Sequence, residues 1–267
     1  MRASERHNVT VLGPESGQPM VFAHGYGCDQ NMWRFVAPEF ADDFRVVLFD
    51  WVGAGGSDLA SYDPEHYSTL QAYADDLVEL IRDLGLEDVV LVGHSVSATI
   101  GVLAEIAAPD LFDKLVLVGP SPCYIDDEGY RGGFTRADIE DLLSSVESNY
   151  LGWSAAIAPV IMGNPDRPEL GQELTSSFCR TDPVVARQFA RATFLTDHRA
   201  DLPRVSTPTL VLQCRDDVIA PMEVGEFVHQ QVPDSRLVVL DATGHCPNLS
   251  APAATTAAIA DFVRPGA

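Results

Sequence analysis

The stretch Leu91–Ala98, LVGHSVSA, follows an apolar run and precedes a helix-like segment of small residues. It nearly matches G-x-S-x-G, the pattern of a serine on a sharp turn from a strand into a helix. Such a turn leaves room only for small residues two positions away, and Gly93 meets this need more freely than Ser97. Ser95 is therefore either a nucleophile or an ordinary helix N-cap serine, and the rest of the chain must decide.

Strand-like runs alternate with helix-like segments around this stretch. Apolar runs at 44–50, 87–93 and 112–118 predict strands, and 70–85 has apolar positions at helical spacing and ends at Gly85. This alternation, with continuous apolar strands, predicts a parallel sheet covered on both faces. Two further runs near the N-terminus flank the turn-rich PESGQ segment and predict a β-hairpin.

The rhythm changes from about Tyr124 to Arg199, where no strand-like run occurs. Apolar residues recur there at spacings of three and four, which predicts helices: Ile139, Leu142, Leu143, Val146, Tyr150, Trp153 and Ile157. Strand-like runs resume at 207–214 and 235–245. We therefore expect one doubly wound, mostly parallel α/β core, made by 1–123 and 200–267, with a helical lid inserted at 124–199.

Composition limits the classes of function. Of the 267 residues, 46% are hydrophobic and 21% are charged, so a sizeable core can form. The net charge of -22 argues against nucleic acid and anionic membranes as partners. The charge is interpreted as aiding solubility or as an adaptation of the host cell, and a cationic partner or substrate is the alternative.

The cysteines, the N-terminal residues and the lengths of the apolar runs predict a soluble protein. Five cysteines without a C-x-x-C pair favour neither a disulfide framework nor a zinc site, and we expect no metal and no cofactor. The N-terminal residues contain no apolar signal-peptide core, and no apolar run approaches the ~18 residues that span a bilayer. The expected location is the cytoplasm.

A serine nucleophile needs a base and an acid that orients the base. His245 comes shortly after the late strand-like segment 235–241, in the context GHCPNLSAP, although seven histidines are present and a surface histidine is the plain alternative. Asp217 follows the run 207–214, and its spacing to Pro221 favours it over the adjacent Asp216. The order serine, aspartate, histidine is the order found in α/β-hydrolases.

Such chemistry also needs two backbone N–H groups to bind the developing oxyanion. Val96, directly after the serine, is expected to supply one, and Tyr26 in HGYG the other. The glycine cluster in DWVGAGGSD has neither nucleotide-binding spacing nor a following helix, so it predicts only a tight turn.

Nearly the whole chain resembles the α/β-hydrolase superfamily. The segments GYGCDQNMW, VLFDWVGAGGSDL, VGHSVSA, GGFTRADIEDLL, FCRTDPVVARQFARATFLTDHR and GHCPN are most similar to the bacterial stress regulator RsbQ and to the plant karrikin and strigolactone receptors. RsbQ-like proteins usually have glycine where Ser97 stands and the plant receptors have serine, so Ser97 does not speak against activity. Tyr26 stands where phenylalanine is common.

The resemblance implies a V-shaped helical cap over a deep apolar pocket, beside a Ser95–Asp217–His245 triad. By position, the substrate pocket would be lined by Tyr26, Phe134, Leu142, Trp153, Ile157, Phe194 and Ile219. Packing within the lid is the alternative role for each of these residues.

Three functions are compatible with these features. The first is a serine hydrolase that cleaves a small apolar ester or lactone. The second is an RsbQ-like signalling protein that binds or slowly hydrolyses a small hydrophobic ligand and acts on a partner phosphatase in a stress pathway. A carbon–carbon bond hydrolase or a cofactor-free haloperoxidase is a third, weaker reading. Haloalkane dehalogenation is disfavoured, because it needs a carboxylate where Ser95 stands.

Overall fold

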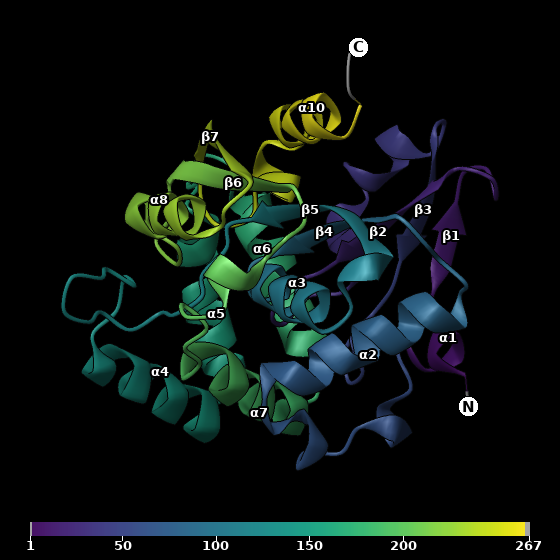
Figure 1. Ribbon diagram of the computed structural model, residues 1–267. Coiled ribbons are helices and arrows are strands. Elements are labelled where there is room, and N and C mark those ends of the chain that lie inside the picture. Colours follow the sequence, from purple (N-terminus) through teal and green to yellow (C-terminus); the bar gives the residue numbers. More distant parts are fainter. Residues whose placement is uncertain (1, 265–267) are drawn as a thin grey trace.

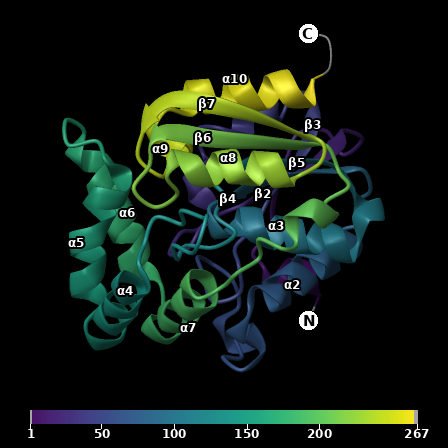
Figure 2. The same ribbon diagram turned by 60° about the vertical axis from the view of Figure 1, so that its left-hand side comes forward.

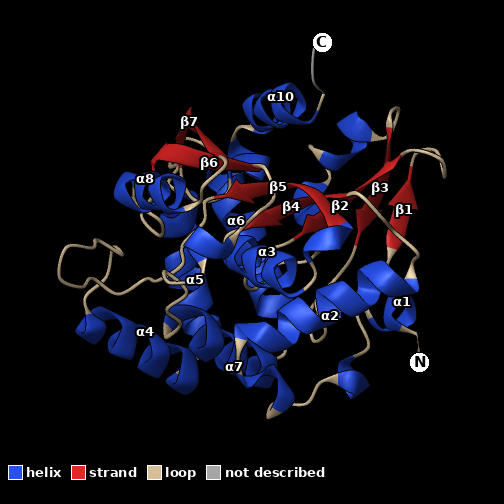
Figure 3. Ribbon diagram, viewed as in Figure 1, coloured by secondary structure: helices blue, strands red, loops and turns tan. Residues whose placement is uncertain are grey.

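A seven-stranded sheet forms the centre of the computed structural model, which describes residues 2–264 (Figures 1 and 3). Its strand order is β1-β3-β2-β4-β5-β6-β7, and only β1 runs antiparallel to its neighbour. The strands are β1 (Thr10–Leu12), β2 (Gln18–Ala23), β3 (Phe44–Leu48), β4 (Val89–His94), β5 (Phe112–Val118), β6 (Thr209–Asp216) and β7 (Ser235–Thr243).

Helices cover both faces of this sheet (Figure 2). One face packs Val21, Val47 and Leu91 against α2 and α3, and the other packs Phe22 and Val92 against the 3₁₀ turns of 30–40 and α10. Because successive strand residues point to opposite faces and both faces are buried, the strands read as continuous apolar runs. The helices are α1 (Ala3–Arg6), α2 (Leu70–Asp83), α3 (Val96–Ala107), α4 (Arg136–Ser148), α5 (Tyr150–Met162), α6 (Pro168–Arg180), α7 (Pro183–Phe194), α8 (Met222–Gln231), α9 (Pro247–Ser250) and α10 (Pro252–Val263).

Helices α4 to α7 form a group that is inserted in the chain between β5 and β6. In both ribbon views they lie together on the side of the molecule opposite the two termini (Figures 1 and 2). Helix α4 starts at a capping box in which Thr135 and Asp138 satisfy each other's backbone N–H groups. We call α4–α7 the helical insertion. No helix among residues 2–264 has the length and apolar character to cross a membrane.

The hairpin predicted near the N-terminus is wrong. β1 pairs antiparallel with β3, and β3 also pairs with β2, so β3 lies between the two strands expected to be neighbours. The PESGQ segment contains a turn, closed by a hydrogen bond from Gly17 N–H to the Pro14 carbonyl at 3.0 Å. A turn signal predicts a change of direction, but it does not say which strand the chain will pair with afterwards.

The carboxyl ends of β4, β6 and β7 lie at one edge of the parallel sheet. Ser95 follows β4, Asp217 follows β6, and His245 comes two residues after β7. Open α/β sheets bind their ligands at this edge. The topology therefore brings three distant segments of the chain to one place.

Candidate active site

Ser95 lies on the sharp turn that the sequence predicts between β4 and α3. Its backbone has φ 58° and ψ -124°, a conformation that a side-chain-bearing residue rarely adopts. A Cβ atom on Gly93 would come within 2.5 Å of the Ser97 carbonyl oxygen, so this position needs glycine. The Ser95 N–H donates to the Val118 carbonyl at 2.8 Å, which fastens the turn to β5. The strain is therefore held by the surrounding sheet.

The side chains of Ser95, His245 and Asp217 form a continuous hydrogen-bonded chain. The Ser95 Oγ lies 2.7 Å from His245 Nε2, and His245 Nδ1 lies 2.7 Å from Asp217 Oδ2. Asp217 Oδ1 accepts from the N–H groups of Ile219 and Ala220 at 2.8 and 3.0 Å. Asp216, the competing acid, is exposed. The geometry can therefore move a proton from the serine to an imidazole whose tautomer a carboxylate holds.

His245 is also held through its backbone. Its N–H donates to the Ile161 carbonyl of α5 at 2.9 Å, and its carbonyl accepts from His94 Nε2 at 2.7 Å. Burial, assisted by the neighbouring His245, lowers the pKa of His94 to about 3. His94 is therefore neutral near pH 7, with its proton on Nε2, and acts as a donor to the loop that carries His245.

The two residues predicted to supply oxyanion donors, Val96 and Tyr26, lie at the start of α3 and in the loop after β2. Val96 is the first residue of α3, so its N–H has no acceptor within the helix. Tyr26 lies in a turn in which the Cys28 N–H donates to the Gly25 carbonyl at 3.3 Å. Neither N–H donates to a backbone carbonyl of residues 2–264. Both groups are thus free to donate to another acceptor.

The Tyr26 side chain contacts the helical insertion. Its hydroxyl donates to the Ala186 carbonyl of α7 at 3.0 Å, and its ring packs edge-on against Trp153, Phe178 and Phe194. The extra oxygen, relative to the phenylalanine common in the resembling group, is therefore used to attach the loop to the helical insertion.

A cavity of about 60 Å³ lies between the sheet edge and the insertion. Ser95 and His245, at its base, are only 6% and 4% exposed. All seven residues predicted for the pocket line it: Tyr26, Phe134, Leu142, Trp153, Ile157, Phe194 and Ile219. The lining is almost entirely carbon, as expected for a site that binds an apolar ligand.

Sequence reasoning missed several other lining residues. Cys28, His94 and Cys246 are chain neighbours of the predicted oxyanion and catalytic residues, so their position alone could have indicated them. In the sequence, Tyr124 was noted only as the first residue of the predicted lid. Tyr124 is buried, and burial raises the pKa of its hydroxyl, an effect that the nearby Ser95 hydroxyl only partly offsets. The rest are Ile161, Leu174, Phe178 and Thr193, all from the insertion.

The described residues offer no obvious place for a metal. Within 2–264, no three histidine, cysteine, aspartate or glutamate side chains gather in a way that could hold an ion. Burial raises the pKa of Cys28 and Cys246, so both thiols next to the cavity are protonated near neutral pH.

Comparison with known proteins places the chain in a family. Residues 20–259 match the alpha/beta hydrolase family, and the chain belongs to it. This confirms the fold class and the assignment to the hydrolases.

The chain is also similar to particular members of that family. It is 40% identical to the karrikin insensitive 2 receptor CA of Petunia hybrida over 93% of this chain and 92% of that protein. It is 39% identical to the strigolactone esterase D14 of Arabidopsis thaliana over 97% and 96% of the two chains. A solved hydrolase from Oleispira antarctica superposes with a TM-score of 0.96, at 40% identity, over 98% of this chain and 96% of that one. The resemblance to the plant receptors is confirmed, and the resemblance to RsbQ stays a prediction.

Proposed function

We propose that this protein is a serine hydrolase that cleaves a small, apolar carboxylic ester or lactone. The observation that carries the proposal is the chain of two 2.7 Å contacts from Ser95 through His245 to Asp217, at the base of an apolar cavity. Relatives named as an esterase and as a hydrolase support it. We further propose that the helical insertion acts as the lid of this cavity.

The reaction follows from the positions of the protons. The Ser95 oxygen attacks the substrate carbonyl carbon while its proton passes to His245 Nε2, and Asp217 stabilises the imidazolium. The carbonyl oxygen becomes an oxyanion that accepts from the Val96 and Tyr26 N–H groups. The carbon–oxygen bond to the leaving group then breaks, and the leaving oxygen takes the proton from His245. Water, deprotonated by His245, then attacks the acyl carbon, and the bond to the Ser95 oxygen breaks as His245 returns the proton to that oxygen, which releases the acid.

The cavity supports a small, apolar substrate. Ser95 is the hydroxyl that faces the imidazole, and the surrounding walls are aromatic and aliphatic side chains. Burying a charged group there without a partner would be costly, so charged esters are expected to be poor substrates.

Replacing Ser95 by alanine tests the mechanism. Ser95→Ala should abolish hydrolysis of 4-nitrophenyl acetate, because a serine nucleophile that is lost leaves only weak residual catalysis. Incubating the native protein with the ester should add one acetyl mass to the peptide that contains Ser95. Unchanged turnover by Ser95→Ala would refute the proposal.

A second candidate function is that of a ligand receptor, and one observation favours it. One of the relatives, at 40% identity over 93% of this chain, is named as a receptor. In this reading the chain binds or slowly hydrolyses its ligand and its insertion contacts a partner, and a partner phosphatase of the RsbQ kind remains a prediction.

The kinetics of acylation separate the two functions. A stoichiometric burst of 4-nitrophenol, followed by very slow turnover, is expected of a receptor that keeps its acyl group. Steady turnover without a burst supports an enzyme whose product leaves freely. Both outcomes are read in the same stopped-flow experiment.

A further inference from the structure

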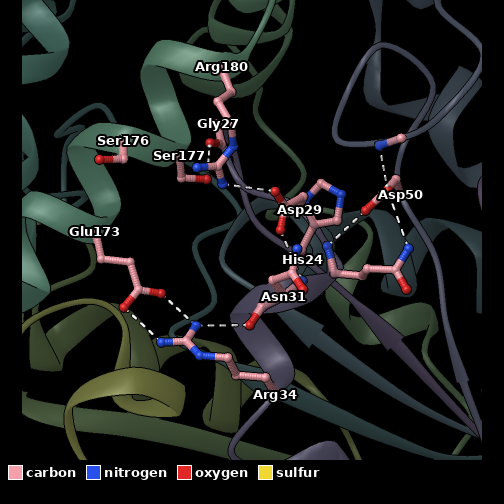
Figure 4. Close-up of polar contacts among 12 residues, drawn as sticks. His24, Gly27, Asp29, Asn31, Arg34, Asp50, Glu173, Ser176, Ser177 and Arg180 are labelled. Atoms are coloured by element: carbon pink, nitrogen blue, oxygen red, sulfur yellow. Dashed lines mark hydrogen bonds and ion pairs between the residues drawn. The ribbon is translucent and has the colours of Figure 1, made fainter.

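Helix α6 presents a line of polar side chains to the loop that carries Tyr26. Glu173, Ser177 and Arg180 are spaced by four and three residues, so they lie on one face of the helix. Figure 4 shows them directed at the loop after β2. We call these three residues the polar face of α6. The buried Leu174 and Phe178 of the same helix line the cavity.

The loop needs such support because a glycine stands on each side of Tyr26. Gly27 has φ +68°, and a Cβ atom there would come within 2.5 Å of the Phe178 ring, so the loop packs tightly against α6. Glycines add backbone freedom. An oxyanion donor acts only if it is held within about 0.5 Å of its productive position.

Hydrogen bonds hold the carbonyls on both sides of Tyr26. On the core side, the His24 carbonyl accepts from Trp51 Nε1 at 3.0 Å and from the Ser97 hydroxyl. On the other side, the Gly27 carbonyl accepts from the buried Ser177 hydroxyl at 3.0 Å. The Tyr26 N–H thus lies between a carbonyl held by two donors from the core and a carbonyl held by one donor from the insertion.

Two ion pairs extend the contact between α6 and the loop (Figure 4). Arg180 Nη2 donates to Asp29 Oδ2 at 3.0 Å. Burial by itself would raise the pKa of Asp29, but the hydrogen bonds from Arg180 and Asn31 outweigh it and hold that pKa below its usual value. Arg34 forms a bidentate ion pair with Glu173: its Nη1 lies 2.5 Å from Oε1 and its Nη2 lies 2.7 Å from Oε2.

We propose that the polar face of α6 positions the Tyr26 oxyanion donor, so that Ser177, Arg180 and Glu173 are positioning residues for catalysis. This inference rests on the proposed hydrolase function. Leu174 and Phe178 of α6 line the cavity, and the polar face of the same helix fastens the loop that carries the donor. The oxyanion site therefore depends on contacts from the insertion.

The test compares two adjacent serines of α6. Ser177→Ala removes the bond to Gly27, whereas Ser176→Ala removes only a bond from an exposed hydroxyl to the Gln172 carbonyl of the same helix. Losing an entire oxyanion donor costs about 10²- to 10³-fold in kcat, so a displaced donor should cost Ser177→Ala about tenfold. KM should change little, and Ser176→Ala should match the native protein. Thermal unfolding of a separate sample first shows that each variant is folded. The kcat and KM of both variants are then measured with 4-nitrophenyl acetate.

Inhibition by phenylboronic acid supplies a readout that a purely structural role would not move. The Ser95 oxygen bonds to the boron as its proton passes to His245, and the tetrahedral boronate that results places a boron-bound oxygen at the oxyanion site. Its affinity should fall about tenfold in Ser177→Ala, in parallel with kcat. Affinities and kcat equal to those of Ser176→Ala would overturn the inference, and so would a loss confined to KM.

The ion pair provides an independent pair of variants in case Ser177→Ala does not fold. Arg180→Ala should lower kcat and boronate affinity together, and Arg180→Lys should restore part of both. Arg191→Ala is the matched control, because Arg191 pairs with Glu147 within the insertion and does not contact the loop. Equal kcat in the Arg180→Ala and Arg191→Ala proteins would count against the proposal. Turnover that persists in Ser95→Ala would refute the hydrolase function itself, and this inference with it.

Discussion

Ser97 shows how one small residue serves both the turn and the loop beside it. It is fully buried, and its hydroxyl donates to the His24 carbonyl while accepting from Trp51 Nε1 at 2.9 Å. The position therefore needs a small side chain for the turn, and the serine hydroxyl adds a contact to the loop that carries Tyr26. Ser97 thus replaces the last glycine of the G-x-S-x-G pattern with a residue that fits the turn and also forms two hydrogen bonds.

Two substitutions at Ser97 test this interpretation. Ser97→Gly should remain active, because Trp51 still donates to the His24 carbonyl, and should lose about 1 kcal/mol of stability from helix propensity and the lost hydroxyl contact. Ser97→Leu should lose activity, because overpacking a filled site costs about 1–3 kcal/mol and here displaces the turn itself. Ester hydrolysis and thermal unfolding measure both. Full activity in the leucine variant would show that the turn has room that the structure does not give it.

Also at the residue scale, the sequence favoured one of two adjacent aspartates as the partner of His245, but it could not show where their side chains point. The spacing to Pro221 favoured Asp217 over Asp216, and the structure turns Asp217 toward His245 and Asp216 toward solvent. The His94 donor and the hydroxyl contact of Tyr26 could not be predicted, because each depends on a carbonyl that lies 151 or 160 residues away in the chain.

At the scale of elements, Tyr26, in the loop after β2, connects the core to α7. Tyr26→Phe should keep its activity on a small ester, because the hydroxyl contacts the Ala186 carbonyl and not the ligand site. The lost hydrogen bond should cost about 0.5–1.5 kcal/mol. In a domain of this size, each kcal/mol lowers Tm by about 2–4 °C. A raised KM with unchanged Tm would show instead that the hydroxyl binds substrate.

Local patterns predicted the elements better than their pairing. The helical spacing of apolar residues at 139–157 is realised in α4 and α5, and the apolar runs at 44–50 and 87–93 in β3 and β4. The error lay in the pairing of β1, which skips β2 to join β3. Periodicity depends on which face of an element is buried, whereas pairing depends on contacts between distant segments.

At the scale of the whole molecule, the large excess of negative charge has no role in the fold or the site described above. The chain has 39 acidic and 17 basic residues, so many carboxylates have no cation to pair with. Ion pairs such as Arg236–Asp261 lie at the surface, with side chains more than half exposed. Exposed pairs of this kind contribute about 0–1 kcal/mol each. Repulsion among the surplus carboxylates therefore dominates the surface electrostatics.

Salt should consequently stabilise this protein. Raising NaCl from about 0.01 M to about 0.15 M shortens the screening length from about 30 Å to about 8 Å, which weakens the repulsion over most of the surface. We expect Tm to rise over this range, and choline chloride to give the same rise, because screening depends on ionic strength and not on the cation. The rate of hydrolysis of a neutral ester should stay constant, since Ser95 and His245 are buried among apolar side chains. A Tm that falls with salt would mean that the surface ion pairs stabilise the protein by more than the repulsion from its net charge of -22 destabilises it.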